Sequence, residues 1–372
     1  MYIARLSLAP LVLTTLIFTA PTLASDGEGS IAEAPVGWDV SAPNYSAGAQ
    51  EIALSVDQGT WMNLDVSPDG KRIAFDLLGD IYEIPIEGGE ASPLLSGHAW
   101  EVQPQYSPDG RFLAFTSDRD GADNIWAMEI ANPENKQQIT HERFRLLNNP
   151  TWHPSGHYLA AKKHFTTSRS LGTGEIWLYD ARLAQSLERT HLQGSVLVEK
   201  PTPSFQKELG EPTFSADGRS VFFIQNTTPG NTFIYHEDSN GEVMAIKRYD
   251  LETGEIEKVV GGAGGAVRPT PSPDGKSLAF VKRVRAASRL FVLNLESGEQ
   301  TMLVDDLDPD MQETWAVQGA YPTMAWMPDG KTIIYWSKGK IGRVNVASGA
   351  IKNIPFSVND SRTAYPAVEV AV

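Results

Sequence analysis

Few side chains in this sequence have the types and the spacing that catalysis needs. No Gly-x-Ser-x-Gly motif exposes a serine nucleophile, and no Gly-x-x-x-x-Gly-Lys motif forms a phosphate-binding loop. Cysteine is absent, and none of the seven His residues belongs to a His-x-His pair. The acidic run 305–310 lacks the glycine and the closing glutamate of a calcium loop. We therefore expect no catalytic residue, no cofactor and no metal site in this chain.

Arginine and tryptophan side chains provide a candidate for binding. The members of this cationic and aromatic set are Trp100, Arg145, Arg169, Arg268, Arg285 and Trp315. Arginine binds a carboxylate through two parallel hydrogen bonds. Several arginines that lie close together repel one another unless an anion neutralises their charge. The set predicts a site for a carboxylate-bearing peptide or an acidic segment of a partner. Alternatively, these residues pair with local acids such as Glu101, Glu142 and Glu175, or brace neighbouring elements.

A four-residue phrase that recurs six times predicts the elements that position this set. Ser67-Pro68-Asp69-Gly70 returns, with substitutions, at starts 40 to 62 residues apart: 107–110, 153–156, 215–218, 272–275 and 327–330. Proline presets φ for a tight turn, aspartate bonds its own backbone, and glycine takes the left-handed position that follows. A period of this length indicates stacking of one supersecondary unit.

Each turn is followed by strand-forming residues. A first apolar run begins two or three residues past the glycine, and a second run carries an aromatic at the same phase in four units, at Tyr82, Trp126, Trp177 and Phe291. A further turn ends three of these runs, at 250–254, 294–298 and 345–349. Each unit thus predicts a four-stranded antiparallel blade, and six such blades predict an all-β, six-bladed β-propeller. Two small β-sandwiches are the alternative.

In a ring of such blades, successive loops lie alternately on the two faces of the ring. The six turns lie together on one face of the ring, and the loops that enter the first strand or join the second strand to the third lie on the other. We expect the cationic and aromatic set on this second face.

The ends of the chain predict four segments. Residues 1–24 resemble a secretory signal, with one charge at Arg5, an apolar run 6–20 and a small-x-small site before Ser25. Residues 25–50 predict a linker, 51–356 the propeller and 357–372 a tail or the start of a downstream region. Residues 51–56 alternate like a strand, and we expect them to close the ring against 351–356. The protein is therefore expected to be exported, to the periplasm or beyond the cell.

Charge narrows the choice of partners. The formal net charge of −15 disfavours nucleic acid and anionic membrane surfaces, so no membrane contact is expected apart from the signal.

The repeated phrase, read with the strands around it, resembles the WD-like repeat of TolB-type propellers. Longer stretches, such as GTWMNLDVSPDG, LLGDIYEIPIEGG and GGAVRPTPSPDGKSLAFV, resemble the N-terminal propeller of exported bacterial proteins that join it to a C-terminal amidohydrolase domain. The resemblance covers about residues 50–360. It implies a metal-dependent hydrolase beyond the propeller, whose His-x-His ligands have no counterpart in this sequence.

Three functions follow from these observations. The first is a non-catalytic TolB-like module of an amidohydrolase-like protein, which binds or gates a partner domain or peptide. The second is a stand-alone periplasmic propeller that captures a peptide or protein. The third is the propeller part of a prolyl-oligopeptidase-like peptidase.

Overall fold

The computed structural model describes residues 40, 48–166, 172–182, 194–238 and 240–365. All of them belong to the unit 38–372. The described residues form strands and turns without a helix, so none of them builds a helix that could cross a bilayer. The all-β prediction is confirmed. The signal segment lies outside the described residues.

Six sheets of four strands account for most of the unit. The first three sheets, in strand order, are β2 (Leu64–Val66), β3 (Arg72–Leu77), β4 (Asp80–Pro85) and β6 (Ser92–Leu95); β7 (Glu101–Tyr106), β8 (Phe112–Ser117), β9 (Asn124–Glu129) and β10 (Asn132–Gln138); and β11 (Leu147–Trp152), β12 (Tyr158–Thr166), β13 (Gly172–Asp180) and β14 (Ser195–Val198).

The next three sheets have the same order. They are β15 (Leu209–Phe214), β16 (Ser220–Asn226), β17 (Met244–Asp250) and β18 (Ile256–Val260); β19 (Val267–Pro271), β20 (Ser277–Val284), β21 (Ala287–Asn294) and β22 (Gln300–Val304); and β23 (Ala325–Trp326), β24 (Thr332–Ser337), β25 (Lys340–Asn345) and β26 (Ile351–Ile354). Every pairing within these sheets is antiparallel, as predicted.

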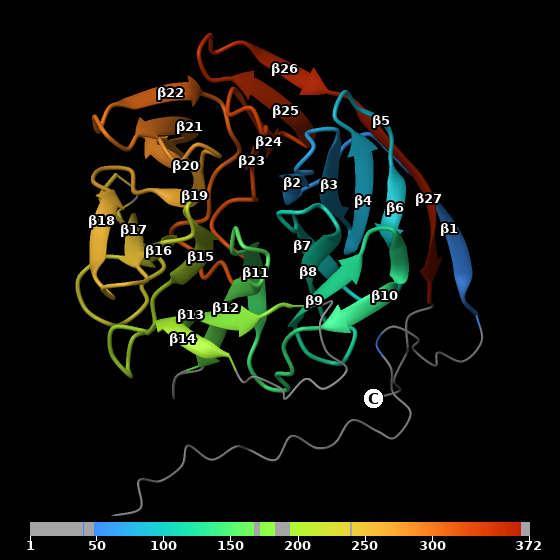
Figure 1. Cartoon of the computed structure of the whole chain (residues 1–372), viewed down its shortest axis with the longest axis horizontal. Helices are drawn as coiled ribbons and strands as arrows, with labels where there is room; N and C mark the ends of the chain where they lie inside the picture. The colour runs from blue at the N-terminus through green and yellow to red at the C-terminus, as the bar shows by residue number, and fades with distance from the viewer. Residues whose placement is uncertain (1–39, 41–47, 167–171, 183–193, 239, 366–372) are drawn as a thin grey trace, which may run out of the picture. The chain divides into compact units, whose positions relative to one another are not determined.

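The six sheets surround a common centre. In Figure 1 the first strand of each sheet lies nearest this centre and the fourth lies outermost. Aromatic residues on the second and third strands stack within a sheet, as Phe75 does on Tyr82 with ring centroids 5.9 Å apart and Phe280 on Phe291 at 5.8 Å. Phe75, Tyr82 and Phe280 are fully buried. Burial of each such ring contributes about 1.5–3 kcal/mol, so apolar packing between strands holds each sheet together.

The repeated turns join the first strand of each sheet to the second. The predicted left-handed glycines are confirmed, with φ of 71° at Gly70, 70° at Gly110, 69° at Gly275 and 68° at Gly330. The first serine of the phrase donates its hydroxyl to the aspartate two residues on, as between Ser67 and Asp69 at 2.7 Å. The aspartate thereby fixes the turn.

Contacts between consecutive turns place them on one rim, as expected. A Cβ added to Gly70 would lie 3.3 Å from Met327 Cε in the last turn, and one added to Gly110 would lie 3.6 Å from Pro68 Cδ in the first. Similar approaches join the turns at 153 and 218, and those at 216 and 275. The last turn therefore lies beside the first.

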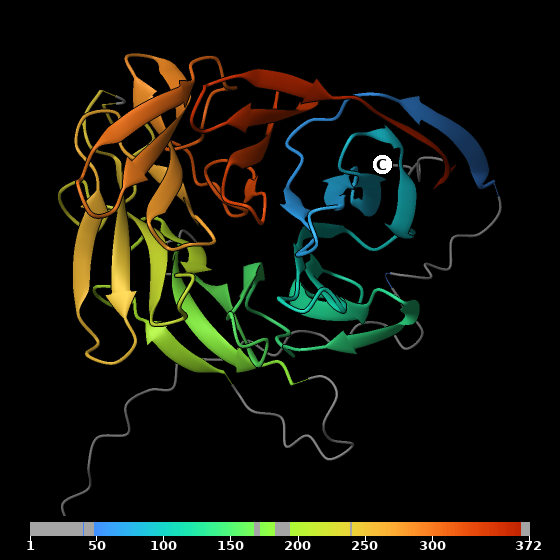
Figure 2. The same cartoon turned by 45° about the horizontal axis from the view of Figure 1, so that its top comes forward.

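A seventh sheet corrects the predicted closure. The strand β1 (Gln50–Val56) pairs antiparallel with β27 (Phe356–Ala364), and β27 pairs parallel with β5 (Gly89–Glu90). The expected pairing of 51–56 with 351–356 is wrong, because the last sheet is already complete with β26. The first part of the predicted tail is therefore strand. Figure 2 shows β1 and β27 as a pair at the outer edge, which we call the strap.

Candidate functional site

Arg268 does not occupy a surface loop. It lies in β19, is 5% exposed, and its guanidinium Nη2 lies 3.1 Å from Glu211 Oε1. Its Nε donates to Tyr321 O at 2.6 Å and its Nη1 to Asn149 Oδ1 at 3.2 Å. The expectation that Arg268 lies in a loop on the second face is wrong, because it belongs to the inner strand β19 and its side chain is buried at the centre of the ring.

Arg145 and Trp315 lie near the same histidine. The Arg145 guanidinium stacks on Phe165, 4.7 Å from the ring centroid, and Trp315 packs against His164 with centroids 5.1 Å apart. Burial lowers the pKa of His164 to about 3, and the nearby positive charges of Lys162 and Arg145 add to this shift. The imidazole is therefore neutral, and Arg145 owes its place to aromatic faces.

Within the part of the chain that the structure describes, Trp100 and Arg285 form no hydrogen bond, ion pair or ring contact with Arg268, Arg145 or Trp315. Trp100 is 49% exposed and its main-chain N–H donates to Asp118 Oδ1 at 2.7 Å. Arg285 is exposed in the tight turn between β20 and β21, at a φ of 59°. Arg169 lies outside the described residues. The local acids named as alternatives pair with other cations, since Glu101 binds Arg119 and Glu175 binds Lys200.

A ring of polar side chains occupies the centre instead. Its members lie four residues before each repeated turn, and we call them the inner ring: Asn63, Gln103, Asn149, Glu211, Arg268 and Thr323. Gln103, Asn149, Glu211 and Arg268 have φ of 60°, 54°, 50° and 55°, beside bulges where their strands pair with the next. Left-handed backbone at such residues costs about 1–3 kcal/mol each, and clustered strain of this kind marks functional positions.

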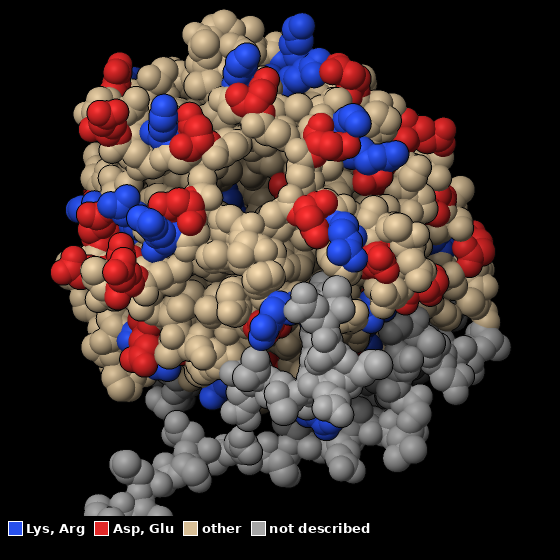
Figure 3. All heavy atoms as spheres, viewed as in Figure 1, with Lys and Arg blue, Asp and Glu red and all other residues tan. Residues whose placement is uncertain are grey.

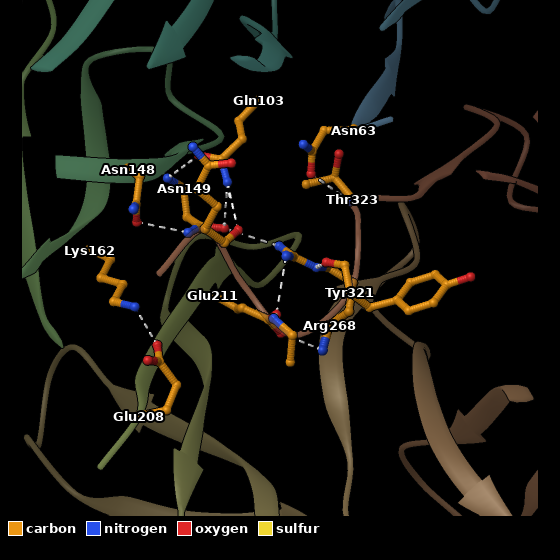
Figure 4. A network of polar contacts seen from close by, with 12 residues as sticks. Asn63, Gln103, Asn148, Asn149, Lys162, Glu208, Glu211, Arg268, Tyr321 and Thr323 are labelled. Atoms are coloured by element: carbon orange, nitrogen blue, oxygen red, sulfur yellow. Dashed lines mark hydrogen bonds and ion pairs between the residues drawn. The ribbon is translucent and has the colours of Figure 1, made fainter. Parts of the chain in front are cut away.

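The inner ring holds a segment of the chain's own backbone. Residues 317–323, which precede β23 and end on the inner-ring member Thr323, pass through the centre, and we call them the central segment (Figure 4). Gln103 Nε2 donates to Gln318 O at 2.7 Å, and Arg268 Nε donates to Tyr321 O. Ala320 N donates to Glu211 Oε1 at 2.6 Å. The side chains of this ring therefore recognise main-chain groups of an irregular segment.

Neighbouring side chains complete this hold. Asn148 Nδ2 donates to Val317 O at 2.9 Å, and Lys162 Nζ donates to the same oxygen at 3.1 Å. Lys162 also pairs with Glu208, and both side chains are buried. Burial raises the pKa of Glu208 and lowers the pKa of Arg268, while the opposite charge beside each group opposes the shift. The centre thus contains two compensated ion pairs.

A funnel opens beside the inner ring on the side of the repeated turns. It has a volume of about 270 Å³, and its wall includes the residues two before each turn: Asp65, Gln105, Thr151, Thr213, Thr270 and Ala325. Arg268, Glu211 and Asn149 also line it. Trp152 and Trp326 are fixed in its wall because their Nε1 atoms donate to Gln105 O and Thr270 O. The funnel offers hydroxyl and amide groups to a ligand.

Asp65 is the ionisable member of the layer two residues before the turns. Its Oδ1 accepts the main-chain N–H of Val66 at 2.9 Å and its Oδ2 that of Tyr106 at 2.8 Å. Although the side chain keeps some contact with solvent, burial in the funnel wall raises its pKa to about 7, against these two hydrogen bonds. Its charge is therefore poised near neutral pH.

The surface around the ring has no dominant sign. Figure 3 shows one face hollowed near its centre, with acidic and basic side chains interspersed around the hollow. Among the described residues, no group of three or more His, Asp or Glu side chains is placed to hold a metal ion. The side chains in the funnel wall can donate and accept hydrogen bonds.

The sequence contains a signal for the inner ring that lies outside the repeated turns. All six positions four residues before a turn are polar, and four of them precede proline: Gln103-Pro104, Asn149-Pro150, Glu211-Pro212 and Arg268-Pro269. Polar residues at a fixed position of an inner strand in every repeat indicate a polar centre. The central segment, by contrast, has no repeat and no motif.

Comparisons with known proteins bear on the fold. No family model matches the chain. The uncharacterized peptidase YuxL of Bacillus subtilis is 25% identical over 209 residues, which are 56% of this chain and 26% of that protein. Dipeptidyl aminopeptidase BIII of Pseudoxanthomonas mexicana is 23% identical over 255 residues, 61% of this chain and 36% of that protein. The chain thus spans about a quarter to a third of the length of these curated relatives.

Solved structures resemble the chain more completely. TolB from Acinetobacter baumannii matches with a TM-score of 0.57 at 16% identity, over 81% of this chain and 64% of that one. A putative TolB from Agrobacterium tumefaciens matches with 0.51 at 18% identity, over 76% and 96%. The tricorn protease matches with 0.55 at 17% identity, over 80% and 26%. Together with the sheet order, these matches show that the chain has a TolB-like β-propeller fold.

Proposed function

We propose that this chain is a non-catalytic, TolB-like propeller module that binds a peptide or a segment of a partner domain in the funnel. One observation carries the proposal. The repeats direct a layer of hydroxyl, amide and carboxyl groups into a cavity of about 270 Å³ on the rim of the repeated turns. Such a volume lies just below the usual range for small-molecule pockets, and it suits one or two residues of an extended chain.

The chain itself supplies a precedent for binding of this kind. The inner ring already hydrogen-bonds the main chain of the central segment through Gln103, Glu211 and Arg268. An incoming peptide presents the same N–H and C=O groups. The funnel continues this polar centre outward with Gln105, Thr213 and Thr270. Main-chain recognition gives affinity, and pockets for alternate side chains give specificity.

We further propose that the six four-stranded sheets are the six blades of the propeller and that the strap is an accessory to the first blade. The contact between the turns at Gly70 and Met327 supports a ring closed by the last sheet on the first. Tyr82 Oη donates to Asp360 Oδ2 at 2.9 Å, and Arg362 pairs with Asp80, so the strap is bound to β4.

Export to the periplasm or beyond and association with an amidohydrolase domain remain part of the proposal. The apolar run 6–20 and the sequence resemblance support them. Sequencing of the reading frame beyond codon 372 tests the association, and a downstream His-x-His strand is the expected result.

Two other functions have some support. The relatives named as peptidases align with 56% and 61% of this chain, which favours the propeller part of a peptidase as the second candidate. The resemblance to TolB favours a stand-alone binding propeller. We also propose a second contact surface that binds acidic segments. Its residues are Trp100, Arg145, Arg169, Arg285 and Trp315.

A photo-crosslinking experiment tests the proposed funnel. Benzoylphenylalanine replaces Thr213 in the funnel wall or, as a matched control, Ser297 in the exposed turn between β21 and β22. The full chain is then irradiated with a defined set of biotinylated ten-residue peptides. We expect crosslinks at position 213 that excess unlabelled peptide suppresses, and none at position 297. Equal labelling at both positions, or labelling at 297 alone, contradicts the proposal.

A further inference from the structure

The funnel carries one ionisable group that its repeated design does not explain. Five of the six residues that lie two before the turns are uncharged, with three threonines among them, whereas the first repeat has Asp65. This aspartate lies in β2 and faces a wall that includes Gln105 and Thr270. A carboxyl group at this position makes one side of the funnel wall ionisable.

Asp65 has no cationic partner among the described residues. Its recorded contacts are the main-chain N–H groups of Val66 and Tyr106. A carboxylate offers about four lone-pair sites, so about two remain for a ligand. Arg268 cannot serve as its counter-ion, since its guanidinium is already paired with Glu211. The funnel as a whole is therefore negative when Asp65 is ionised.

We propose that the funnel binds a primary ammonium group of a polypeptide, either the amino terminus or a lysine side chain, against Asp65. This inference rests on the proposed function and names the chemistry that the site selects. The volume of about 270 Å³ admits one such group with its carbon chain. Trp152 and Trp326 stand in the same wall, and indole faces attract cations.

The charges around the funnel disfavour the opposite choice, a carboxylate held by Arg268. An incoming carboxylate would compete with Glu211, whose Oε2 also accepts the main-chain N–H of Arg268 at 2.5 Å. Breaking that buried pair would leave Glu211 uncompensated. The strongly acidic chain also repels anions and attracts cations over longer distances.

Proton uptake gives the site a pH dependence. Burial raises the pKa of Asp65 to about 7. The charged or titratable groups that face it are Tyr106, with Glu83 bonded to its hydroxyl at 2.7 Å, and the compensated pair of Arg268 and Glu211 across the funnel. A bound ammonium favours the ionised carboxylate, so binding of a lysine side chain tightens as the pH rises from 5.5 to 8 and releases a proton near pH 7. Binding of an amino terminus tightens only to about pH 7, because its own pKa is about 8.

Three small probes test the inference with the full, ¹⁵N-labelled chain. Nα-acetyl-lysine amide carries the ammonium on a side chain, alanyl-alaninamide carries it at the amino terminus, and Nα-acetyl-alanyl-alaninamide carries none. The amide signals of Val66 and Tyr106 report binding, because these N–H groups donate to Asp65. The variants are Asp65→Asn and, as a control outside the funnel, Asp118→Asn, which changes an aspartate that also accepts a main-chain N–H, that of Trp100.

The expected result is that one or both ammonium probes shift these signals and bind at least about tenfold more tightly than the acetylated probe, a ratio that one charge-assisted hydrogen bond supplies. The lysine and alanine probes distinguish the two sources of ammonium. Asp65→Asn abolishes the preference and Asp118→Asn keeps it. For the wild type, the preference disappears at pH 5.5, a readout that does not depend on the folding of a variant.

Three outcomes overturn the inference. Equal binding of all three probes in the funnel refutes the ammonium preference and leaves the proposed peptide site intact. Failure of every probe to move the Val66 and Tyr106 signals, when the ten-residue peptides still crosslink at position 213, refutes the role of Asp65 alone. Failure of both the probes and the crosslinking refutes the site and the inference together.

Discussion

Truncation of Arg268 to alanine is the sharpest test of the polar centre. The guanidinium lies 3.1 Å from Glu211 Oε1 and donates to Tyr321 O and Asn149 Oδ1, all in the buried centre. Without it, the Glu211 carboxylate keeps the N–H groups of Ala320 and residue 268 but loses its counter-charge. Removal of one partner from a buried pair costs about 3–5 kcal/mol, and we expect Arg268→Ala to lower the free energy of unfolding by that amount.

Urea unfolding followed by tryptophan fluorescence and circular dichroism measures this change. A matched control is Arg182→Ala, which removes an exposed arginine paired with Asp180 and should leave stability almost unchanged. Adding Glu211→Gln to Arg268→Ala removes the uncompensated charge and should recover about half of the loss. A loss below about 1 kcal/mol for Arg268→Ala, or strict additivity in the double variant, would refute the reasoning.

Further predictions concern the turns, the funnel, the strap and the second surface. Gly70→Val destabilises the chain by about 1–3 kcal/mol and Gly70→Asn by less, because asparagine tolerates left-handed backbone; equal urea midpoints for the two variants contradict the turn assignment. Burial raises the pKa of Asp65 to about 7, above its unfolded value near 4, so it contributes stability at low pH that is lost as the pH rises towards 7. Asp65→Asn should therefore flatten the fall in stability between pH 4 and 7, and an unchanged slope in urea titrations argues otherwise. Arg362→Ala breaks the ion pair with Asp80 and should speed hydrogen exchange in β1 and β27 alone; acceleration throughout the ring would show that the strap supports every sheet. Joint replacement of Arg145 and Arg285 by alanine should weaken binding of an acidic peptide about tenfold, and unchanged affinity by calorimetry removes the second surface.

The architecture was predictable from the sequence because each repeat contains, within a few residues, the signals for its own turn and strands. Ser67 to Gly70 encodes a turn through proline, aspartate and glycine, and the strand signals on both sides fix which strands the turn joins. Six copies of a local signal determine the sheets before any long-range contact is known. The strap was missed in part because β27 pairs with β1 across some 300 residues, and no local pattern encodes that choice.

The site was harder to predict because its geometry is not local. Arg268 was grouped with loop arginines by its charge, although it shares its position with Gln103, Asn149 and Glu211 in other repeats. Comparison of the repeats would have placed it in an inner strand. The central segment could not be inferred at all, since its contacts depend on where a loop between β22 and β23 crosses the ring.

The central segment also has a consequence for how the chain folds. In a linear repeat protein each unit contacts only its neighbours, so units can form one after another and stability is close to a sum over them. Here residues 317–323 satisfy buried polar groups of the second, third, fourth and fifth sheets, and Thr323 N donates to Asn63 Oδ1 beside the first. A nascent chain that has completed β15 still carries Gln103, Asn148 and Glu211 without these partners. The early sheets therefore cannot reach their final stability until almost the whole sequence has been synthesised, and the ring should form and unfold as one cooperative unit, slowly, with a high contact order.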